Sequence, residues 1–309
     1  MRATILTDRQ KHAYLIMVHK NTYVLEKLLQ LLDYEYNDIY IHVDRKCTNF
    51  NWKKYRRLIR RGQLFNTSER ISVTWGEFTQ IKAELVLLRT AFNYRNYQYY
   101  HLLSGQDLPL QSQQRIHNFF DEHEGQIFIT SRCIDKKIDP GIYDRASVKR
   151  LFSQRPNHKL LLRKLEGFCD KVYLEFQKII LRRDYVQSKN IQLAYGANWF
   201  SLPESVVKCI LDNQDKIRYY FKDGVCADEL FVQSILREYG IKTMDNNLRL
   251  IDWGRGSYAH PYTWHITDYV QLISSDDLFA RKFDENVDRE IIDKIVEHVI
   301  STSQGAPKS

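Results

Sequence analysis

The sequence predicts an α/β protein whose central sheet is mostly parallel and is flanked by helices. Residues 13–43 contain a strand, a helix and a second strand, the pattern of a parallel βαβ unit of about 30 residues. The same alternation continues to residue 122. In such sheets ligands bind beyond the carboxyl ends of the strands. Asp44 and Asp107 both stand just after predicted strands, so we expect a ligand site at that edge.

Apolar runs and helical spacing define the elements of this first half. Short apolar runs bounded by polar residues are typical of buried strands, and apolar residues three and four apart indicate helices. The predicted strands span 13–18, 38–43, 71–75 and 98–103. The predicted helices span 23–32, 52–61, 79–92 and 113–122, the second of them a densely basic, solvated one. His42, inside the second strand, is expected to be a satisfied strand histidine.

Residues 135–188 differ in composition and predict a helical insertion. The segment begins polar and basic, and residues 159–181 then show the spacing of a long amphipathic helix. Its apolar row is Leu161, Leu165, Phe168, Val172, Phe176 and Ile179. Two interpretations stay open: the row packs into the core, or it contacts an acceptor or a membrane.

The second half contains two adjacent carboxylates between two predicted strands. The strands are expected at 195–203, where Gly196 allows another backbone or a ligand to approach closely, and at 247–253. Asp228 and Glu229 precede an apolar run with helical spacing, and acidic residues stabilise the first turn of a helix. A charged helix start is therefore one interpretation. The other is a sugar site, because an aromatic ring such as that of Trp253 can cover a pyranose and a positioned carboxylate can accept a hydroxyl proton.

Length and composition predict one domain over residues 1–309. With 309 residues and 43% hydrophobic content, the chain can bury one large core. We expect a nucleotide-binding half at 11–130 and an acceptor and catalytic half at 190–285, separated by the insertion. A helix is expected at 291–300, followed by a disordered tail at 301–309.

Charge and cysteine content limit the class of protein without selecting one partner. A net charge of +8 attracts polyanions, nucleotide diphosphates or anionic membranes, so a polyanion- or RNA-binding module is a competing interpretation. No RNP-like, KH or zinc-knuckle signature occurs, and we expect no nucleic-acid partner. The five cysteines are dispersed, which predicts reduced thiols. No long apolar run occurs, so a cytoplasmic protein is expected, and peripheral contact with the inner face of the membrane is a further option.

Motifs for phosphate and metal binding are missing from the sequence. There is neither a GxxxxGK[ST] nor a GxGxxG pattern. Many sugar-nucleotide transferases hold a divalent ion with a DxD pair, and no such pair occurs in the chain. We therefore predict no metal and no cofactor. The alternative is a metal-dependent transferase with Asp44 as a ligand, which activity in EDTA would distinguish.

Five sequence blocks resemble one known family. The strings ADELF at 227–231 and NNLRLIDW at 246–253 resemble the core of the Core-2/I-branching β-1,6-N-acetylglucosaminyltransferases, glycosyltransferase family 14, which includes the peptide O-xylosyltransferases. Similar blocks follow the family's order at 41–46, 101–110 and 278–284. The resemblance implies a soluble, bacterial-type member with a GT-A-like fold. It also implies inverting, metal-independent transfer of N-acetylglucosamine or xylose from a UDP-sugar to a glycan or lipid-linked saccharide.

The resemblance also implies roles for individual residues. Glu229 matches the family's general base, and Asp228 would support it while pointing in a different direction. Lys282 matches the lysine of a basic pair that neutralises the diphosphate. The family's arginine has no counterpart in 260–268, so Arg255, Arg281 or His265 is expected to replace it. The residues expected beside the nucleotide are Val18, His19 and Asp44. Those expected on the acceptor side are Trp199, Trp253 and Asp107.

Overall fold

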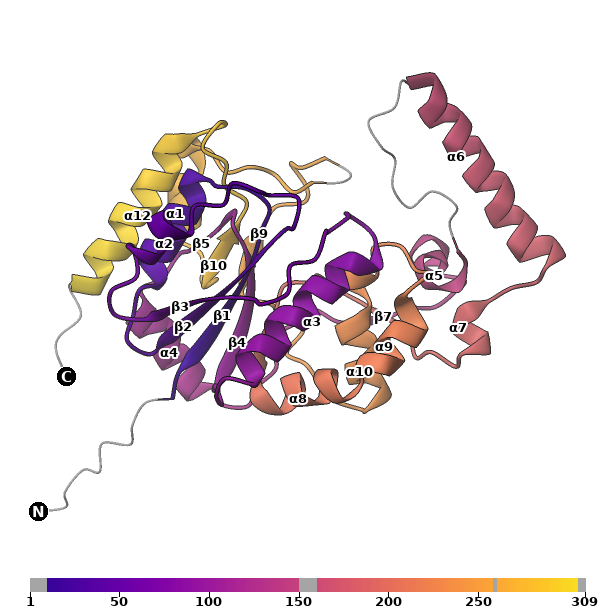
Figure 1. Ribbon diagram of the computed structural model, residues 1–309, viewed down its shortest axis with the longest axis horizontal. Helices are drawn as coiled ribbons and strands as arrows, with labels where there is room; N and C mark the ends of the chain where they lie inside the picture. The colour runs from indigo at the N-terminus through magenta and orange to yellow at the C-terminus, as the bar shows by residue number, and fades with distance from the viewer. Residues whose placement is uncertain (1–9, 150–159, 258–259, 305–309) are drawn as a thin grey trace, which may run out of the picture.

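A five-stranded sheet forms the centre of the molecule. The computed structural model describes residues 10–149, 160–257 and 260–304, with the side chains of 160–165 and 304 left out (Figure 1). The strand order is β3-β2-β1-β4-β8. The first four strands run parallel, and β8 pairs antiparallel with β4 at the edge. The strands of this sheet are β1 (His12–Val18), β2 (Asn37–Val43), β3 (Gln63–Asn66), β4 (Tyr99–Ser104) and β8 (Ser201–Pro203).

Two smaller sheets complete the β structure. The first is a three-stranded sheet with the strand order β5-β10-β9. Its central strand, β10, runs parallel to β9 and antiparallel to β5. Strands β6 and β7 form an antiparallel pair. The bounds of these strands are β5 (Asp107–Pro109), β6 (Arg132–Cys133), β7 (Ala194–Tyr195), β9 (Arg249–Ile251) and β10 (Phe279–Arg281).

Helices cover both faces of the central sheet. The first half contains α1 (Tyr23–Leu32), α2 (Trp52–Arg56), α3 (Phe78–Phe92) and α4 (Gln113–Glu122). The insertion contains α5 (Pro140–Ser147), α6 (Leu160–Glu175), the π-helix η1 (Phe176–Ile180) and α7 (Tyr185–Ser188). The second half contains α8 (Glu204–Asp212), α9 (Gln214–Phe221), the 3₁₀ turn η2 (Ala227–Glu229), α10 (Phe231–Glu238), the 3₁₀ turn η3 (Ile266–Asp268), α11 (Tyr269–Ile273) and α12 (Arg289–Gln304).

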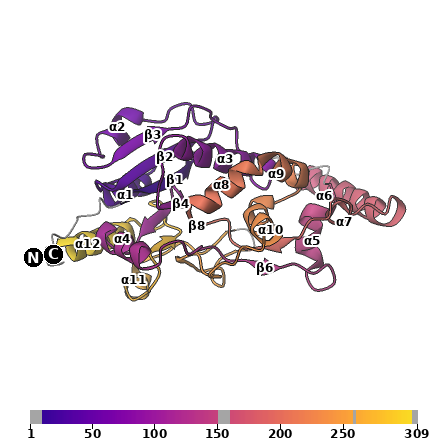
Figure 2. The same cartoon turned by 90° about the horizontal axis from the view of Figure 1, so that it is seen from below.

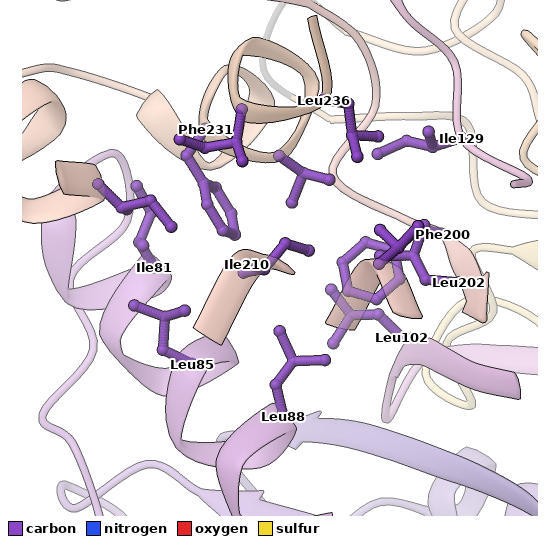
Figure 3. Packing of buried hydrophobic residues seen from close by; sticks show 14 of the residues in the cluster. Ile81, Leu85, Leu88, Leu102, Ile129, Phe200, Leu202, Ile210, Phe231 and Leu236 are labelled. Carbon is purple, nitrogen blue, oxygen red and sulfur yellow. The ribbon is translucent and has the colours of Figure 1, made fainter. Parts of the chain in front are cut away.

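Alternating residues of the buried strands supply two hydrophobic cores. Leu15 of β1 packs into a core with residues of α3, α8 and α10, which Figure 3 shows from close by. Its neighbour Ile16 packs into a second core with residues of α1, α4 and α12. Both side chains are fully buried, because helices cover both faces of a parallel sheet. The predicted α/β class, with a mostly parallel central sheet flanked by helices, is confirmed.

No strand forms at 71–75, so that prediction is wrong. The strand that pairs with β2 is β3, which begins eight residues earlier than the predicted one. Residues 71–74 form an irregular segment that is fastened to the end of β2. The Ile71 amide donates to Nε2 of His42 (2.9 Å), and the Ile71 carbonyl accepts from the Arg45 amide (3.0 Å). Burial lowers the pKa of His42 to about 4, which keeps the ring neutral as an acceptor. The structural interpretation of His42 is therefore confirmed.

The strand predicted at 195–203 is also wrong as a single element, since it divides into β7 and β8. The chain turns between them because it passes directly against Thr130. A Cβ atom on Gly196 would lie 1.8 Å from the Thr130 carbonyl oxygen, so only glycine fits. The close backbone approach expected at Gly196 is thus present.

Two expected helix boundaries are corrected by the structure. The helix at the end of the chain extends from Arg289 to Gln304, so residues 301–304 are helical where a tail was expected. Residues 305–309 lie outside the described residues. The carboxylate pair forms η2 before α10 begins at Phe231, so it precedes the helix proper.

The insertion forms an arm at one end of the molecule, away from α12 (Figure 2). The helix expected over 159–181 is present as α6 followed by η1, and Lys159 lies outside the described residues. Four members of its apolar row, Phe168, Val172, Phe176 and Ile179, are exposed and do not enter either core, and the side chains of Leu161 and Leu165 lie outside the described ones. The core-packing interpretation is therefore wrong for these four residues. No helix within the described ranges is long and apolar enough to span a bilayer.

Candidate active site

Asp228 and Glu229 leave η2 in different directions. The Asp228 side chain is buried, and its Oδ2 accepts hydrogen bonds from the amides of Gln80 (3.1 Å) and Asn198 (3.3 Å). The Glu229 side chain is 24% exposed, and its Oε2 lies 2.5 Å from Nη1 of Arg145. The expected divergence of the two carboxylates is present. Glu229 is the member of the pair that an incoming molecule can reach.

Burial changes the protonation of the carboxyl groups behind Glu229. Burial, together with the negative charge of Glu229, raises the pKa of Asp228 to about 7. Glu84 of α3 is fully buried nearby, and burial and Asp228 raise its pKa well above the ordinary value. Desolvation favours the neutral form of such groups. Glu84 therefore retains its proton near neutral pH, and Asp228 is only partly ionised there, behind the more exposed carboxylate of Glu229.

Glu229 lines a pocket of about 380 Å³ together with Trp253. The Trp253 ring is 51% exposed and follows β9, whereas Glu229 comes from η2. Other residues of the lining are Thr130, Arg132, Tyr195, Gly196 and Asn247. A carboxylate and an accessible aromatic face thus meet in one cavity, as a sugar-binding site requires.

Arg145 and Tyr195 are site residues that the sequence analysis missed. Arg145 lies on α5 of the insertion, and its guanidinium is 5.4 Å from the centre of the Tyr195 ring. Burial and the charge of Glu229 raise the pKa of Tyr195. No familiar pattern marks the segment that contains Arg145, so only the fold brings it to Glu229. Its side chain fixes one oxygen of the carboxylate.

Val18, His19 and Asp44 meet at the carboxyl ends of β1 and β2. The Asp44 amide donates to the Val18 carbonyl oxygen (2.7 Å), and Asp44 is buried. Oδ1 of Asp44 accepts from the Lys46 amide (2.8 Å), which fixes the carboxylate at the mouth of the sheet. His19 is exposed and lies within electrostatic range of Asp44 and Arg281. These residues therefore lie together at the edge where the sequence predicts a ligand.

Arg281 contacts both Asp107 and Trp199. Its Nη1 lies 2.6 Å from Oδ1 of Asp107, and its guanidinium lies 4.4 Å from the centre of the Trp199 ring. Asp107 also accepts from the amide (2.8 Å) and hydroxyl (2.9 Å) of Ser104 at the end of β4. Asp107 and Trp199 are both buried. They hold Arg281 in place, whereas Trp253 lines the Glu229 pocket.

Lys282 and Arg255 have different surroundings. Lys282 follows Arg281 directly, and burial together with the Arg281 charge lowers its pKa. Arg255 is bound within its own loop, since its Nε lies 2.6 Å from Asp252 and its Nη1 lies 2.7 Å from Asp268. His265 Nδ1 lies 3.7 Å from Asp288. Of the candidates to accompany Lys282, Arg281 is the one adjacent to it and within electrostatic range of His19.

A continuous series of contacts joins the two ends of the site. Arg281 stacks on Trp199, and the preceding residue, Asn198, donates to Asp228 beside Glu229. The two clusters, though far apart in sequence, are thus connected through the Asn198–Trp199 dipeptide. The edge of the sheet and the Glu229 pocket form one candidate active site.

Two larger cavities, of about 570 and 400 Å³, lie along α3 and α9. Neither includes Glu229 or Trp253 in its lining. Both are lined by Lys82 and Arg218, and the larger one also by Arg45 and Arg70. Among the described residues, no three His, Cys, Asp or Glu side chains are grouped as a metal ion would require. Independence from metal stays a prediction.

Comparison with known proteins identifies the family. Residues 12–277 match the family model described as Core-2/I-Branching enzyme. The chain belongs to the Core-2/I-Branching enzyme family. This confirms the resemblance: four of the five sequence blocks lie within the matched residues, and the block at 278–284 follows them. Membership of the family supports a glycosyltransferase.

Curated relatives of this Core-2/I-Branching family member are xylosyltransferases. Xylosyltransferase 2 of Rattus norvegicus is 21% identical over 315 residues, which cover 93% of this chain and 33% of the relative. The xylosyltransferase of Ciona intestinalis is 18% identical over 305 residues, covering 91% of this chain and 33% of the relative. The chain thus spans about a third of the length of these relatives. Among solved structures, mouse xyloside xylosyltransferase 1 matches with a TM-score of 0.39 and 8% identity, over 87% of this chain and 96% of that one.

Proposed function

We propose that the protein is an inverting glycosyltransferase that moves N-acetylglucosamine or xylose from a UDP-sugar to a hydroxyl of a glycan or lipid-linked saccharide. The observation that carries this proposal is the shared pocket of Glu229 and Trp253, joined through Asn198 and Trp199 to the basic residue Arg281. A base, an aromatic platform and cations for a leaving group are the parts that this reaction needs. Family membership supports the same class of chemistry.

Glu229 is proposed as the general base. The acceptor hydroxyl oxygen attacks the anomeric carbon as the bond from that carbon to the UDP oxygen breaks. The hydroxyl proton passes to the Glu229 carboxylate, and UDP leaves with the bonding electron pair. Attack from the face opposite UDP inverts the configuration. Arg145 orients the carboxylate through the 2.5 Å contact to Oε2, and the Trp253 ring would cover the acceptor sugar.

Arg281 and Lys282 are proposed to offset the charge that develops on the diphosphate. Fixed cations can stabilise a leaving phosphate without a metal ion. Arg281 is held by Asp107 and Trp199, so it pays little conformational entropy when a ligand binds. Asp44 and the Val18 carbonyl stand where the nucleoside would enter, at the carboxyl ends of β1 and β2.

One experiment tests the proposal directly. The protein is incubated with a panel of UDP-sugars and saccharide acceptors, and released UDP and the anomeric configuration of the product are measured with and without EDTA. We expect transfer with inversion from UDP-N-acetylglucosamine or UDP-xylose, unchanged by EDTA. Loss of transfer in EDTA would support the metal-dependent alternative. A product with retained configuration would contradict the role proposed for Glu229.

A further inference from the structure

Helix α6 and the π-helix η1 are amphipathic, but their apolar face is turned toward solvent and not toward the core. Two of their polar side chains, Asp170 and Gln177, are buried. Their large apolar side chains face outward and are between 40 and 65% exposed. We name this outward set the apolar ridge; it consists of Phe168, Val172, Phe176, Ile179, Ile180 and Leu181.

Polar contacts within the arm hold η1 and the end of α6 in this orientation relative to α5. The Gln177 side chain accepts from the Lys149 amide (3.1 Å) and donates to the Lys149 carbonyl oxygen (2.7 Å). Lys178 forms an ion pair with Asp144 of α5 (2.5 Å). At the end of the arm, Asp184 accepts from the hydroxyl of Tyr143 (3.0 Å). Rotating α6 and η1 relative to α5 would break these contacts, so the arm's own packing keeps the ridge outward.

The ridge has the composition of a surface that enters a bilayer interface. Exposed apolar side chains gathered on one helical face mark an interaction site. Basic side chains border them, because Lys171, Arg182 and Arg183 are all exposed. The exposed carboxylate Glu175 lies 4.0 Å from Lys178, which partly offsets its charge. Apolar residues edged by Lys and Arg are typical of helices that lie in the plane of an anionic membrane.

We propose that the apolar ridge docks the protein on the surface of an anionic lipid bilayer. The apolar side chains would enter the region between headgroups and acyl chains, while the bordering cations would contact lipid phosphates. A second copy of the chain would present the same positive border to the ridge, whereas anionic headgroups complement it. The bilayer is therefore the occupant that the charges favour.

The arm is connected to the candidate active site through consecutive residues of α5. Asp144 pairs with Lys178 of η1, and the next residue, Arg145, pairs with Glu229. A docked ridge would thus hold the Glu229 pocket near the membrane surface. If the proposed function is correct, on which this step rests, the acceptor class favoured is a saccharide attached to a lipid.

Vesicle binding tests the proposal without requiring any activity. The full chain is sedimented with vesicles of phosphatidylcholine alone and of phosphatidylcholine mixed with phosphatidylglycerol. We expect binding to the mixed vesicles, and at least about a tenfold loss of partitioning in Phe176→Ser/Ile179→Ser. Val270→Ser/Val287→Ser, which changes two exposed valines far from the arm in sequence, is the matched control and should bind like the wild type.

Two further double variants test how much the basic side chains contribute to vesicle binding. Lys171→Glu/Arg183→Glu should weaken binding to the mixed vesicles several-fold, and added salt should reduce this difference. Lys53→Glu/Arg57→Glu makes the same charge change on exposed residues near α2 and should have a much smaller effect. Equal effects of the two pairs would show that net charge, and not the ridge, attracts the protein, and would overturn the proposal.

A second measurement keeps the proposal falsifiable if a variant folds poorly. Cys169, exposed on α6, is labelled with an environment-sensitive fluorophore in a Cys133→Ser background. Its emission should shift to the blue with mixed vesicles. No shift, or no sedimentation of the wild type, would overturn the proposal. A concentration-dependent dimer that Phe176→Ser/Ile179→Ser dissociates, without vesicle binding, would identify the ridge as a self-association face instead. If vesicles bind but no UDP-sugar is used, only the proposed function fails.

Discussion

The first half of the chain and the inserted arm place the same kinds of residue in opposite positions. In β1, Leu15 and Ile16 are fully buried, and the exposed polar residues His19 and Lys20 follow the strand. In the arm, Phe168 and Ile179 are each 65% exposed, while Gln177 is fully buried. The difference shows that apolar spacing predicts a helix but not the face that the protein buries. That face depends on what the neighbouring segment offers, and α5 offers polar groups.

The largest effect is expected at Glu229, where the arm meets the second half of the chain. Glu229→Gln preserves size but removes the base, so transfer should fall by about two to four orders of magnitude. UDP binding and the melting temperature should change little, because the side chain is partly exposed and lies in the pocket proposed for the acceptor. Steady-state transfer kinetics and calorimetry with UDP measure the two expectations.

Asp228→Asn is the control for this prediction. The Asp228 carboxyl is buried against Gln80 and Asn198, so the variant should retain more activity than Glu229→Gln. The opposite order would show that the wrong carboxylate was chosen. Near-normal transfer by both variants would contradict the proposed mechanism.

The next effect concerns Lys282 at the donor end. Lys282→Met should weaken UDP binding by about 1–3 kcal/mol, the scale of a hydrogen bond to a charged group. Arg255→Met is the comparison, because two carboxylates, those of Asp252 and Asp268, engage this arginine, whereas one engages Arg281. Its UDP affinity, measured by calorimetry, should match the wild type. A loss as large as that of Lys282→Met would make Arg255 the second diphosphate cation in place of Arg281.

A smaller effect is expected for Arg145, which connects the arm to the chemistry. Arg145→Met releases Oε2 of Glu229, and misplacing the base should lower the transfer rate about tenfold or more. Lys136→Met removes a different ion pair of the arm, with Asp184, and should leave the rate nearly unchanged. Single-turnover transfer rates at saturating substrate measure the difference between the Arg145→Met and Lys136→Met variants. If both variants lose the same activity, the arm contributes only stability.

An effect of a different kind, on stability and not on transfer, is expected in the pH dependence of unfolding. The pKa of Asp228 is raised from 3.8 to about 7, so the folded state retains a proton that the unfolded state releases between these values. The contribution of Asp228 to the free energy of unfolding therefore falls as pH rises from about 4 to about 7, and it stays lower at higher pH. Asp228→Asn should gain melting temperature relative to the wild type between about pH 4 and about pH 8. Parallel melting profiles would contradict this, and exposed Asp212→Asn is the control.

Much of the fold could be predicted because its signals are local. The α1 bounds agree with the spacing of the leucines, and β1 and β2 agree with their apolar runs to within a residue. The strand expected at 71–75 was wrong because its bonds are made to the His42 side chain and the Arg45 backbone, not to a neighbouring strand. Apolar composition alone does not distinguish a ladder from such an attachment.

The candidate site was predictable where a residue follows a predicted strand, as Asp44 does, or precedes an apolar helical run, as Glu229 does, and where the resemblance supplied a residue such as Lys282. Asp44, Arg281, Lys282, Glu229 and Trp253 all lie at the two joined ends of the site. The roles of Trp199 and Asp107 around Arg281 were not foreseen, since those contacts link residues 82 and 174 positions apart. Arg145 lay in a segment without a recognisable pattern. The roles of all these residues in the reaction stay predictions.

The long separation of Asp107 and Arg281 determines when the molecule can become stable during synthesis. The ribosome makes Asp107 well before its partner, which follows 174 residues later. Strand β4 likewise waits for β8, since Tyr99 pairs with Pro203. Until then one edge of the nascent sheet stays open, and the apolar ridge emerges during the same interval. Such non-local closure is slow and leaves intermediates prone to aggregation. Nascent chains of this protein are therefore expected to depend on chaperones until β10 has left the exit tunnel.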